Sequence, residues 1–164
     1  MRSFISIFAL IIFSFITASS QQRVAVLPFY NMDGKEELNT FCYQLQDSLS
    51  KELIINNTGE TKFYVVPNDS IELVLAEMNF DPNSPSYKDD LWKALEKLKC
   101  NKAVIGELQQ QGSKLVVNAS LCIVEMRLPI PQYQLRNLFV KPEEIYRVIP
   151  PICKKLLPGV ATVQ

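Results

Sequence analysis

Two spacings of apolar residues alternate along the chain, and each change of spacing marks a predicted element. The apolar runs at 23–28 and 62–66 predict two buried strands. These strands are expected to end at Pro28 and Pro67, because proline cannot donate to a sheet ladder. Between them, apolar side chains recur at intervals of three and four, which predicts an amphipathic helix ending near Asn56. The apolar face of that helix carries Leu38, Phe41, Cys42, Leu45, Leu49 and Leu53.

Two further helices are predicted after the second strand. Asn68 or Asp69 is expected to cap the first of them, because both side chains accept hydrogen bonds from backbone N–H groups. Ser86 with Asp89 three residues later has the spacing of a capping box and is expected to open the second helix. The sequence therefore places two consecutive helices before the next strand.

The second half of the chain predicts a hairpin, an edge strand and a final helix. The hairpin covers 102–126 around a Gln-Gly-Ser turn, and the edge strand covers 132–140. Pro142 is expected to begin the last helix, which Pro150 and Pro151 should break into two short pieces. The predicted fold class is a single-domain α/β sandwich with a mixed sheet, in the order β-α-β-α-α-β-β-β-α.

The first residues have the pattern of an export signal. Arg2 precedes an apolar run at 4–16, and the small residues at 18–20 suit a signal peptidase. A membrane anchor is the alternative, but the run is shorter than the roughly 20 apolar residues that a spanning helix needs, and no basic cluster follows it. We therefore expect a cleavable signal peptide at 1–20 and a mature domain at 21–164. The protein is expected in the periplasm or cell envelope, or secreted if the source is eukaryotic.

Composition narrows the function classes. The chain contains no histidine, which excludes Ser-His-Asp and Cys-His catalysis and most zinc sites. Acidic and basic residues are nearly balanced and form no long basic stripe, so nucleic acid is not an expected partner. We expect a protein that is not an enzyme, that has no cofactor, and whose mature chain has no transmembrane segment. Whether it forms a homo-oligomer stays open.

Four cysteines in an exported chain raise the question of disulfides. If the hairpin turns around Gln111, Cys100 lies nearly opposite Cys122, and this is the favoured bridge. Cys42 and Cys153 are expected on the first and last helices, which would share a face of the sheet. The alternative is four free thiols that are buried as small apolar side chains.

Other polar residues give weaker indications of a site. Asn31 and Asp33 follow the first strand, where α/β proteins often bind ligands, although no glycine-rich phosphate loop is present. No metal site is predicted, because each adjacent acidic pair falls in or near the first turn of a predicted helix, where it interacts favourably with the helix dipole. These pairs are Glu36 and Glu37, Asp89 and Asp90, and Glu143 and Glu144.

The order of four short motifs resembles a known group of bacterial proteins. A strand reading VAVLPF at 24–29 precedes a helix and the strand FYVV at 63–66, and the hairpin pairs KAVIGEL at 102–108 with KLVVNASL at 114–121. This pattern resembles the N-terminal domain of TolB and the related CsgG-like and LpoB-like envelope proteins over nearly the whole mature chain. The resemblance implies an envelope protein that works by protein–protein contact, with no known catalytic residues in the shared domain.

The chain also departs from that group. Residues 127–131 read RLPIP where the group usually has an Asp-x-x-Thr-Gly-like turn. No β-propeller follows, as it does in TolB, and no long alternating hairpins are present to build a CsgG-like pore. The cysteine of a lipoprotein signal is also absent. The specific partners of those proteins are therefore not carried over.

Two functional hypotheses follow. The first is an exported adaptor or assembly subunit that binds envelope proteins through its edge strand and the 128–140 region. Its candidate contact residues are Leu128, Ile130, Tyr133 and Trp92. The alternative is a periplasmic small-molecule-binding module that uses the loops after the first two strands, with Asn31 and Asp33. An enzyme comes third, since the chain lacks histidine.

Overall fold

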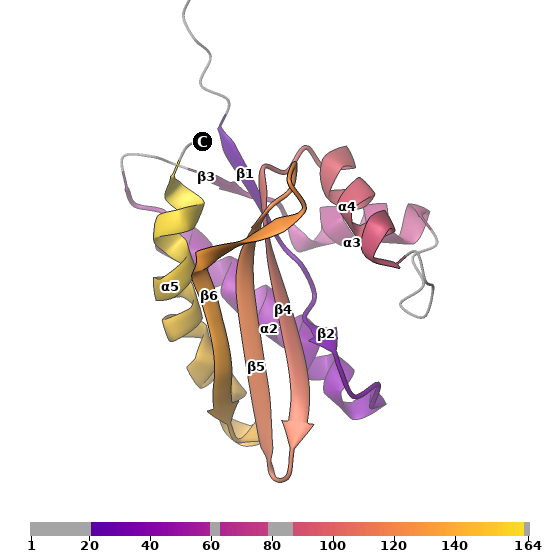
Figure 1. Cartoon of the computed structure of the whole chain (residues 1–164), viewed down its shortest axis with the longest axis vertical. Helices are drawn as coiled ribbons and strands as arrows, with labels where there is room; N and C mark the ends of the chain where they lie inside the picture. Colours follow the sequence, from indigo (N-terminus) through magenta and orange to yellow (C-terminus); the bar gives the residue numbers. More distant parts are fainter. Residues whose placement is uncertain (1–20, 60–62, 79–86, 163–164) are drawn as a thin grey trace, which may run out of the picture.

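The strands form one mixed sheet that is parallel on one side and antiparallel on the other (Figure 1). The computed structural model describes residues 21–59, 63–78 and 87–162. Within these residues the sheet order is β3-β1-β4-β5-β6, and β2 pairs separately with β4. The strands are β1 (Gln22–Val26), β2 (Tyr30–Asn31), β3 (Phe63–Val65), β4 (Lys102–Gln111), β5 (Lys114–Ile123) and β6 (Leu128–Val140).

Pairing directions follow from the connections between the strands. β1 runs parallel to both β3 and β4, because helical segments separate these strands in the chain. β4, β5 and β6 are antiparallel neighbours joined by short turns. The expected α/β sandwich with a mixed sheet is confirmed, and so is the order of its main elements.

Helices cover the two faces of the sheet unequally. The main core lies between the sheet and α2 (Glu36–Ile55), the 3-10 helix η2 (Pro142–Val148) and α5 (Ile149–Ala161). A smaller core joins α3 (Asn68–Glu77) and α4 (Tyr87–Lys97) to the other face near β1. In Figure 1, α3 and α4 lie beside the upper end of the sheet, and no helix lies in front of the lower halves of β4, β5 and β6.

Several predicted boundaries differ from the structure. α3 begins at Asn68 with Pro67 at the cap position, and no side chain caps it. Asn68 is itself the first helical residue and cannot be the cap. Its carboxamide oxygen accepts a hydrogen bond from the Ser50 hydroxyl at 3.1 Å. The expected capping by Asn68 or Asp69 is therefore wrong. The expected capping box at Ser86 lies outside the described residues, as does the expected signal peptide.

The last helix is divided as expected, and the prolines determine where. η2 ends at Val148 and α5 begins at Ile149, so Pro150 and Pro151 fall in the first turn of α5. Proline is tolerated there because the first N–H groups of a helix have no partner within the helix. The prolines thus begin the second helical piece.

A buried lysine joins the end of α5 to the sheet. Lys102 is 1% exposed, and its ammonium group donates to the carbonyl oxygens of Gly159 at 2.6 Å and Thr162 at 2.5 Å. These carbonyls lie at the C-terminal end of α5, where a helix leaves acceptors unpaired and its dipole favours a cation. Burial lowers the pKa of the Lys102 ammonium. This contact fixes α5 against the strand at the middle of the sheet.

We expect Gly106→Ala to destabilise the fold. A methyl group at Gly106 would overlap the ring of Phe29, which is itself buried. Overpacking of this kind is expected to lower the free energy of unfolding by about 1–3 kcal/mol. Urea titration of the variant and the wild type measures the difference. Gly59→Ala is the matched control, because an added methyl there meets no atom within 4 Å. Equal stability of the two variants would contradict this packing.

Candidate functional site

β6 is the long outer strand of the described sheet. It contains thirteen residues and pairs with β5 alone, whereas the opposite edge strand, β3, contains three. An edge strand presents backbone N–H and C=O groups that another chain can pair with. β6 begins at Leu128, four residues before the expected start at 132. It accommodates Pro129 and Pro131 because proline is tolerated in an edge strand.

Two irregularities interrupt the pairing of β6 with β5. The register shifts between Val117 and Ala119 and again between Ser120 and Cys122. At the first shift, Asn137 takes a left-handed backbone with φ +59°, and its N–H donates to the Asn118 side chain at 2.8 Å. Such bulges twist an edge strand and limit indiscriminate pairing with other chains.

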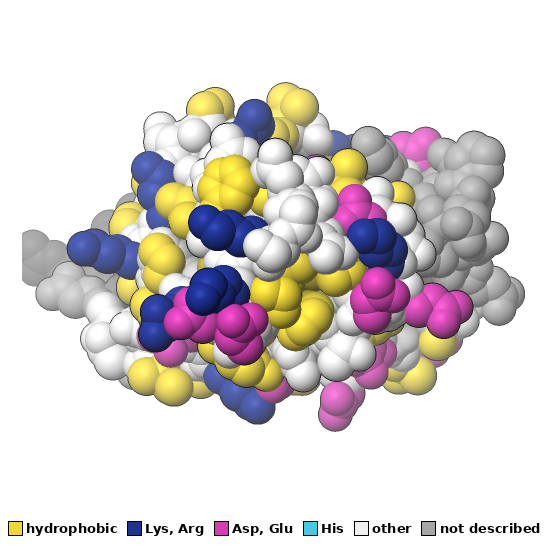
Figure 2. All heavy atoms as spheres, turned by 90° about the horizontal axis from the view of Figure 1, so that it is seen from below, with side chains coloured by type: hydrophobic (Ala, Val, Ile, Leu, Met, Phe, Trp, Pro, Cys, Tyr) yellow, Lys and Arg dark blue, Asp and Glu magenta, His cyan; other side chains and the backbone are white. Residues whose placement is uncertain are grey.

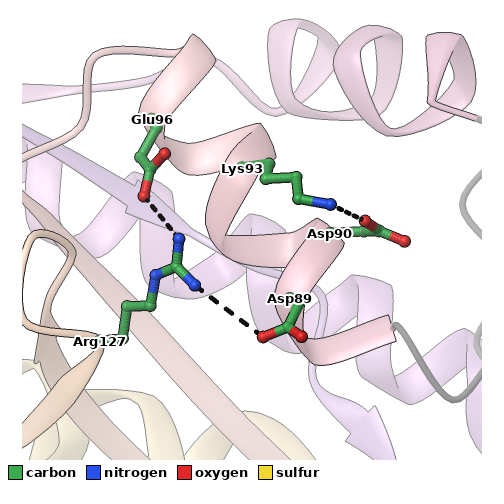
Figure 3. A network of polar contacts seen from close by, with 5 residues as sticks. All are labelled: Asp89, Asp90, Lys93, Glu96 and Arg127. Carbon is green, nitrogen blue, oxygen red and sulfur yellow. Dashed lines mark hydrogen bonds and ion pairs between the residues drawn. The ribbon is translucent and has the colours of Figure 1, made fainter.

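The beginning of β6 is held against α4 by an arginine. Arg127 donates to Glu96 at 3.1 Å and lies 3.9 Å from an Asp89 oxygen, between the two carboxylates (Figure 3). Nearby on α4, Lys93 donates to Asp90 at 2.8 Å. Because all these groups are at least partly exposed to water, which screens the charges, the pairs contribute little to stability. The two Arg127 contacts link the turn that precedes Leu128 to α4.

The four predicted contact residues differ in their exposure to solvent. Leu128 is 60% exposed and available to a partner. Ile130 and Tyr133 are half-buried and pack against the main core. The Tyr133 ring also lies against Gly159 of α5. Trp92 is half-buried against the smaller core on α4, so only Leu128 is mainly exposed.

Sequence reasoning missed two exposed apolar side chains near the ends of β6. Met126 is 63% exposed just before the strand, and Phe139 is 56% exposed near its carboxyl end. Leu138 and Val140, on either side of Phe139, belong to the main core or pack against it. Since side chains alternate along a strand, this alternation was a signal that could have identified Phe139 as outward-facing.

A hollow of about 330 Å³ lies at the carboxyl end of β6. Its lining residues are Lys114, Leu138, Phe139, Val140, Lys141, Glu144, Arg147, Val148 and Pro151. Figure 2 views the molecule from the end at which the β4–β5 turn lies. Lys and Arg side chains gather mostly over the left half of that view, where hydrophobic side chains lie between them, and Asp and Glu predominate on the right.

Asn31 ends the short strand β2, Asp33 lies in the turn that follows it, and both side chains bond to the protein itself. The Asn31 amide donates to the Lys35 carbonyl at 2.7 Å and to Asn39 at 2.8 Å. Asp33 accepts from the Gln110 backbone N–H at 2.6 Å. These bonds join the loop to α2 and β4. The ligand-binding role of this pair stays a prediction, and the described residues contain no group of acidic or cysteine side chains arranged to hold a metal ion.

The four cysteines are free and buried. Cys122 lies opposite Ala103, and Cys100 precedes β4, so the expected facing of Cys100 and Cys122 is wrong. The turn lies after Gln111, where Gly112 supplies a positive φ of 62°, and the register differs accordingly. Cys42 and Cys153 do lie on helices that share one face of the sheet.

The fold is similar to that of known bacterial proteins, although the sequence is not. No family model matches the sequence, and no curated protein matches it. E. coli LpoB, solved by NMR, has a TM-score of 0.55 at 10% identity, over 75% of this chain and 58% of LpoB. The LpoB C-terminal domain from Escherichia coli has a TM-score of 0.51 at 12% identity, over 76% of this chain and 86% of that domain.

The likeness to LpoB shows a shared fold and confirms that part of the resemblance. TolB from Acinetobacter baumannii matches over 84% of this chain and 29% of TolB at 17% identity, but its TM-score of 0.44 is too low to establish a shared fold. The CsgG part of the resemblance stays a prediction. None of the described helices is both long enough and apolar enough to cross a membrane.

We expect all four thiols to resist alkylation in the native protein. Each is buried, and burial raises the pKa of each to about 11, so little reactive thiolate forms at pH 8. Mass spectrometry after iodoacetamide treatment without reductant should show no adducts in the folded protein and four in urea. Two adducts in urea would instead reveal a disulfide.

The same thiols should make stability fall as the solution becomes alkaline. Between the ordinary pKa of 9.0 and the raised value of about 11, the folded chain keeps protons that the unfolded chain loses. The free energy of unfolding should therefore decrease from pH 9 to pH 11. Replacing Cys42 and Cys153 by alanine should make this decrease shallower in urea titrations at each pH. An unchanged slope would contradict the assignment.

Proposed function

We propose that this protein is an exported, non-enzymatic envelope protein that acts as an adaptor or assembly subunit, and that its partner binds along β6. The observation that carries the proposal is the geometry of β6, a thirteen-residue edge strand with an exposed apolar side chain near each end. These side chains are Leu128 and Phe139. A strand of this length spans roughly 40 Å, enough to bind an extended segment of another protein.

The partner would add a strand to the sheet. Main-chain hydrogen bonds would supply much of the affinity, and side chains at alternate positions would supply specificity. Pro129 and Pro131 lack N–H donors, so pairing is expected mainly along the later part of β6. The exposed Leu128 would then contact the partner beside the paired segment, close to the Arg127 contacts with α4.

Two further observations support this function. The chain has the LpoB fold, which agrees with the resemblance of its motifs to envelope proteins. The export-signal pattern of the first residues supports placement in the periplasm or cell envelope. Because identity to LpoB is low, the partner of this chain is to be identified by experiment.

We expect Leu128→Arg to weaken partner binding without unfolding the protein. The side chain is 60% exposed, so the substitution should change the free energy of unfolding by less than about 0.5 kcal/mol. Leu73→Arg is the matched control, because Leu73 is 62% exposed and lies on α3 and not on β6. A photo-crosslinking residue at 128 should trap a defined envelope protein in cells of the native host, and the trapped protein is then used to measure affinity.

The affinity of the trapped partner decides the outcome. Leu128→Arg should reduce it about tenfold or more, since a charged side chain would be forced against an apolar contact. Leu73→Arg should leave it unchanged. Equal affinities for the two variants, or the same crosslinks from positions 73 and 128, would refute the assignment of β6 as the contact surface.

A further inference from the structure

The hollow at the carboxyl end of β6 places two lysines opposite each other. Leu115 of β5 pairs with Val140 of β6, and this is the last pair of the ladder at that end. The next residue outward on each strand is a lysine, Lys114 and Lys141, and both line the hollow. Like charges at facing positions destabilise a pair of strands. The facing of the two lysines therefore does not stabilise this end of the sheet.

The charges around these lysines leave them uncompensated. Arg147 adds a third cation to the lining, and Glu144 is the one carboxylate among the lining residues. Glu144 already pairs with Arg147 at 3.0 Å. Among the described residues, neither Lys114 nor Lys141 takes part in an ion pair. The hollow is thus a basic site with room for an anionic group.

Its apolar lining adds a second requirement. The Phe139 side chain is 56% exposed, and Leu138, Val148 and Pro151 line the same hollow. An apolar side chain placed here would cover exposed hydrophobic surface, and removing that surface from water is favourable. A ligand that fits both features carries carboxylates and an apolar side chain close together.

We propose that this hollow binds an acidic, extended peptide segment of the partner protein, with carboxylates at Lys114 and Lys141 and an apolar side chain against Phe139. This inference rests on the proposed function, because the hollow continues the edge of β6 along which a partner strand would run. A flat anionic membrane surface fits less well. It would meet the Glu144 carboxylate and could not enter the concave space.

The probe is a synthetic pentapeptide of alternating glutamate and valine with phenylalanine at its centre. It is titrated into isotopically labelled full-length protein while backbone amide NMR signals are followed. Signals from residues 114, 138–141 and 147–149 should shift together. The shifts should weaken at high salt, because exposed ion pairs are screened. A peptide with lysine in place of glutamate should not shift these signals.

Matched charge reversals locate the binding site. Lys114→Glu with Lys141→Glu should weaken binding of the acidic peptide about tenfold or more. Lys154→Glu with Lys155→Glu changes the net charge equally at exposed positions of α5 outside the hollow, and should leave binding unchanged. Phe139→Ser should weaken binding, whereas Tyr43→Ser, on an equally exposed aromatic residue of α2, should not.

The proposal is overturned if the lysine peptide shifts the same signals, or if the two double variants bind the acidic peptide equally. The proposal is also overturned if the peptide does not bind and vesicles containing about one third phosphatidylglycerol do. That vesicle binding would have to depend on Lys114 and Lys141. Partner affinity that depends on Leu128 would then still stand, so failure of the hollow is distinguishable from failure of the proposed function.

Discussion

The packing of β4 is the constraint on which both layers of the structure depend. This strand pairs with β1, β2 and β5. Val104 and Leu108 point into the main core, and Ala103 points into the smaller one. A shift of one residue in its register would exchange these faces and expose both cores. Gly106 allows the Phe29 ring to lie directly against the strand. The positions of α2, α5, α3 and α4 all follow from this strand.

The buried ammonium of Lys102 extends the same constraint to the end of the chain. Taking a lysine out of water is costly unless its donors are satisfied, and here it donates to two carbonyls at the end of α5. Gly159, whose carbonyl accepts one of these hydrogen bonds, also receives the Tyr133 ring of β6. α5 is therefore fixed to β4 at one contact and supports the edge strand at another. The edge strand therefore has a packed helical layer behind it.

The edge strand combines features that favour binding with features that limit it. Two prolines and two register shifts interrupt the regular pattern of β6, which discourages uncontrolled pairing between copies. Leu128 and Phe139 stay exposed near its ends, and the lysine pair lies at the carboxyl end. A selective contact surface is expected to have this combination, because specificity needs repulsive as well as attractive elements.

Local patterns in the sequence determined most of the elements. Apolar spacing located the helices, prolines marked where strands end, and alternation located the hairpin, because each depends on neighbours in the chain. The edge strand begins four residues before its predicted start, since proline at 129 and 131 argues against a strand unless that strand is known to lie at an edge. The facing of Cys100 and Cys122 failed because the register depends on where Gly112 turns the chain.

What the sequence by itself determined is the α/β order and the absence of histidine chemistry. Only the tertiary structure decided which predicted contact residues are free. It buried much of Ile130, Tyr133 and Trp92 and left Leu128 exposed. It also brought Lys114 and Lys141 together. These residues lie on different strands, and their proximity is set by the β5–β6 register and not by their spacing in the chain. Exposure and juxtaposition depend on long-range packing, which one-dimensional patterns do not encode.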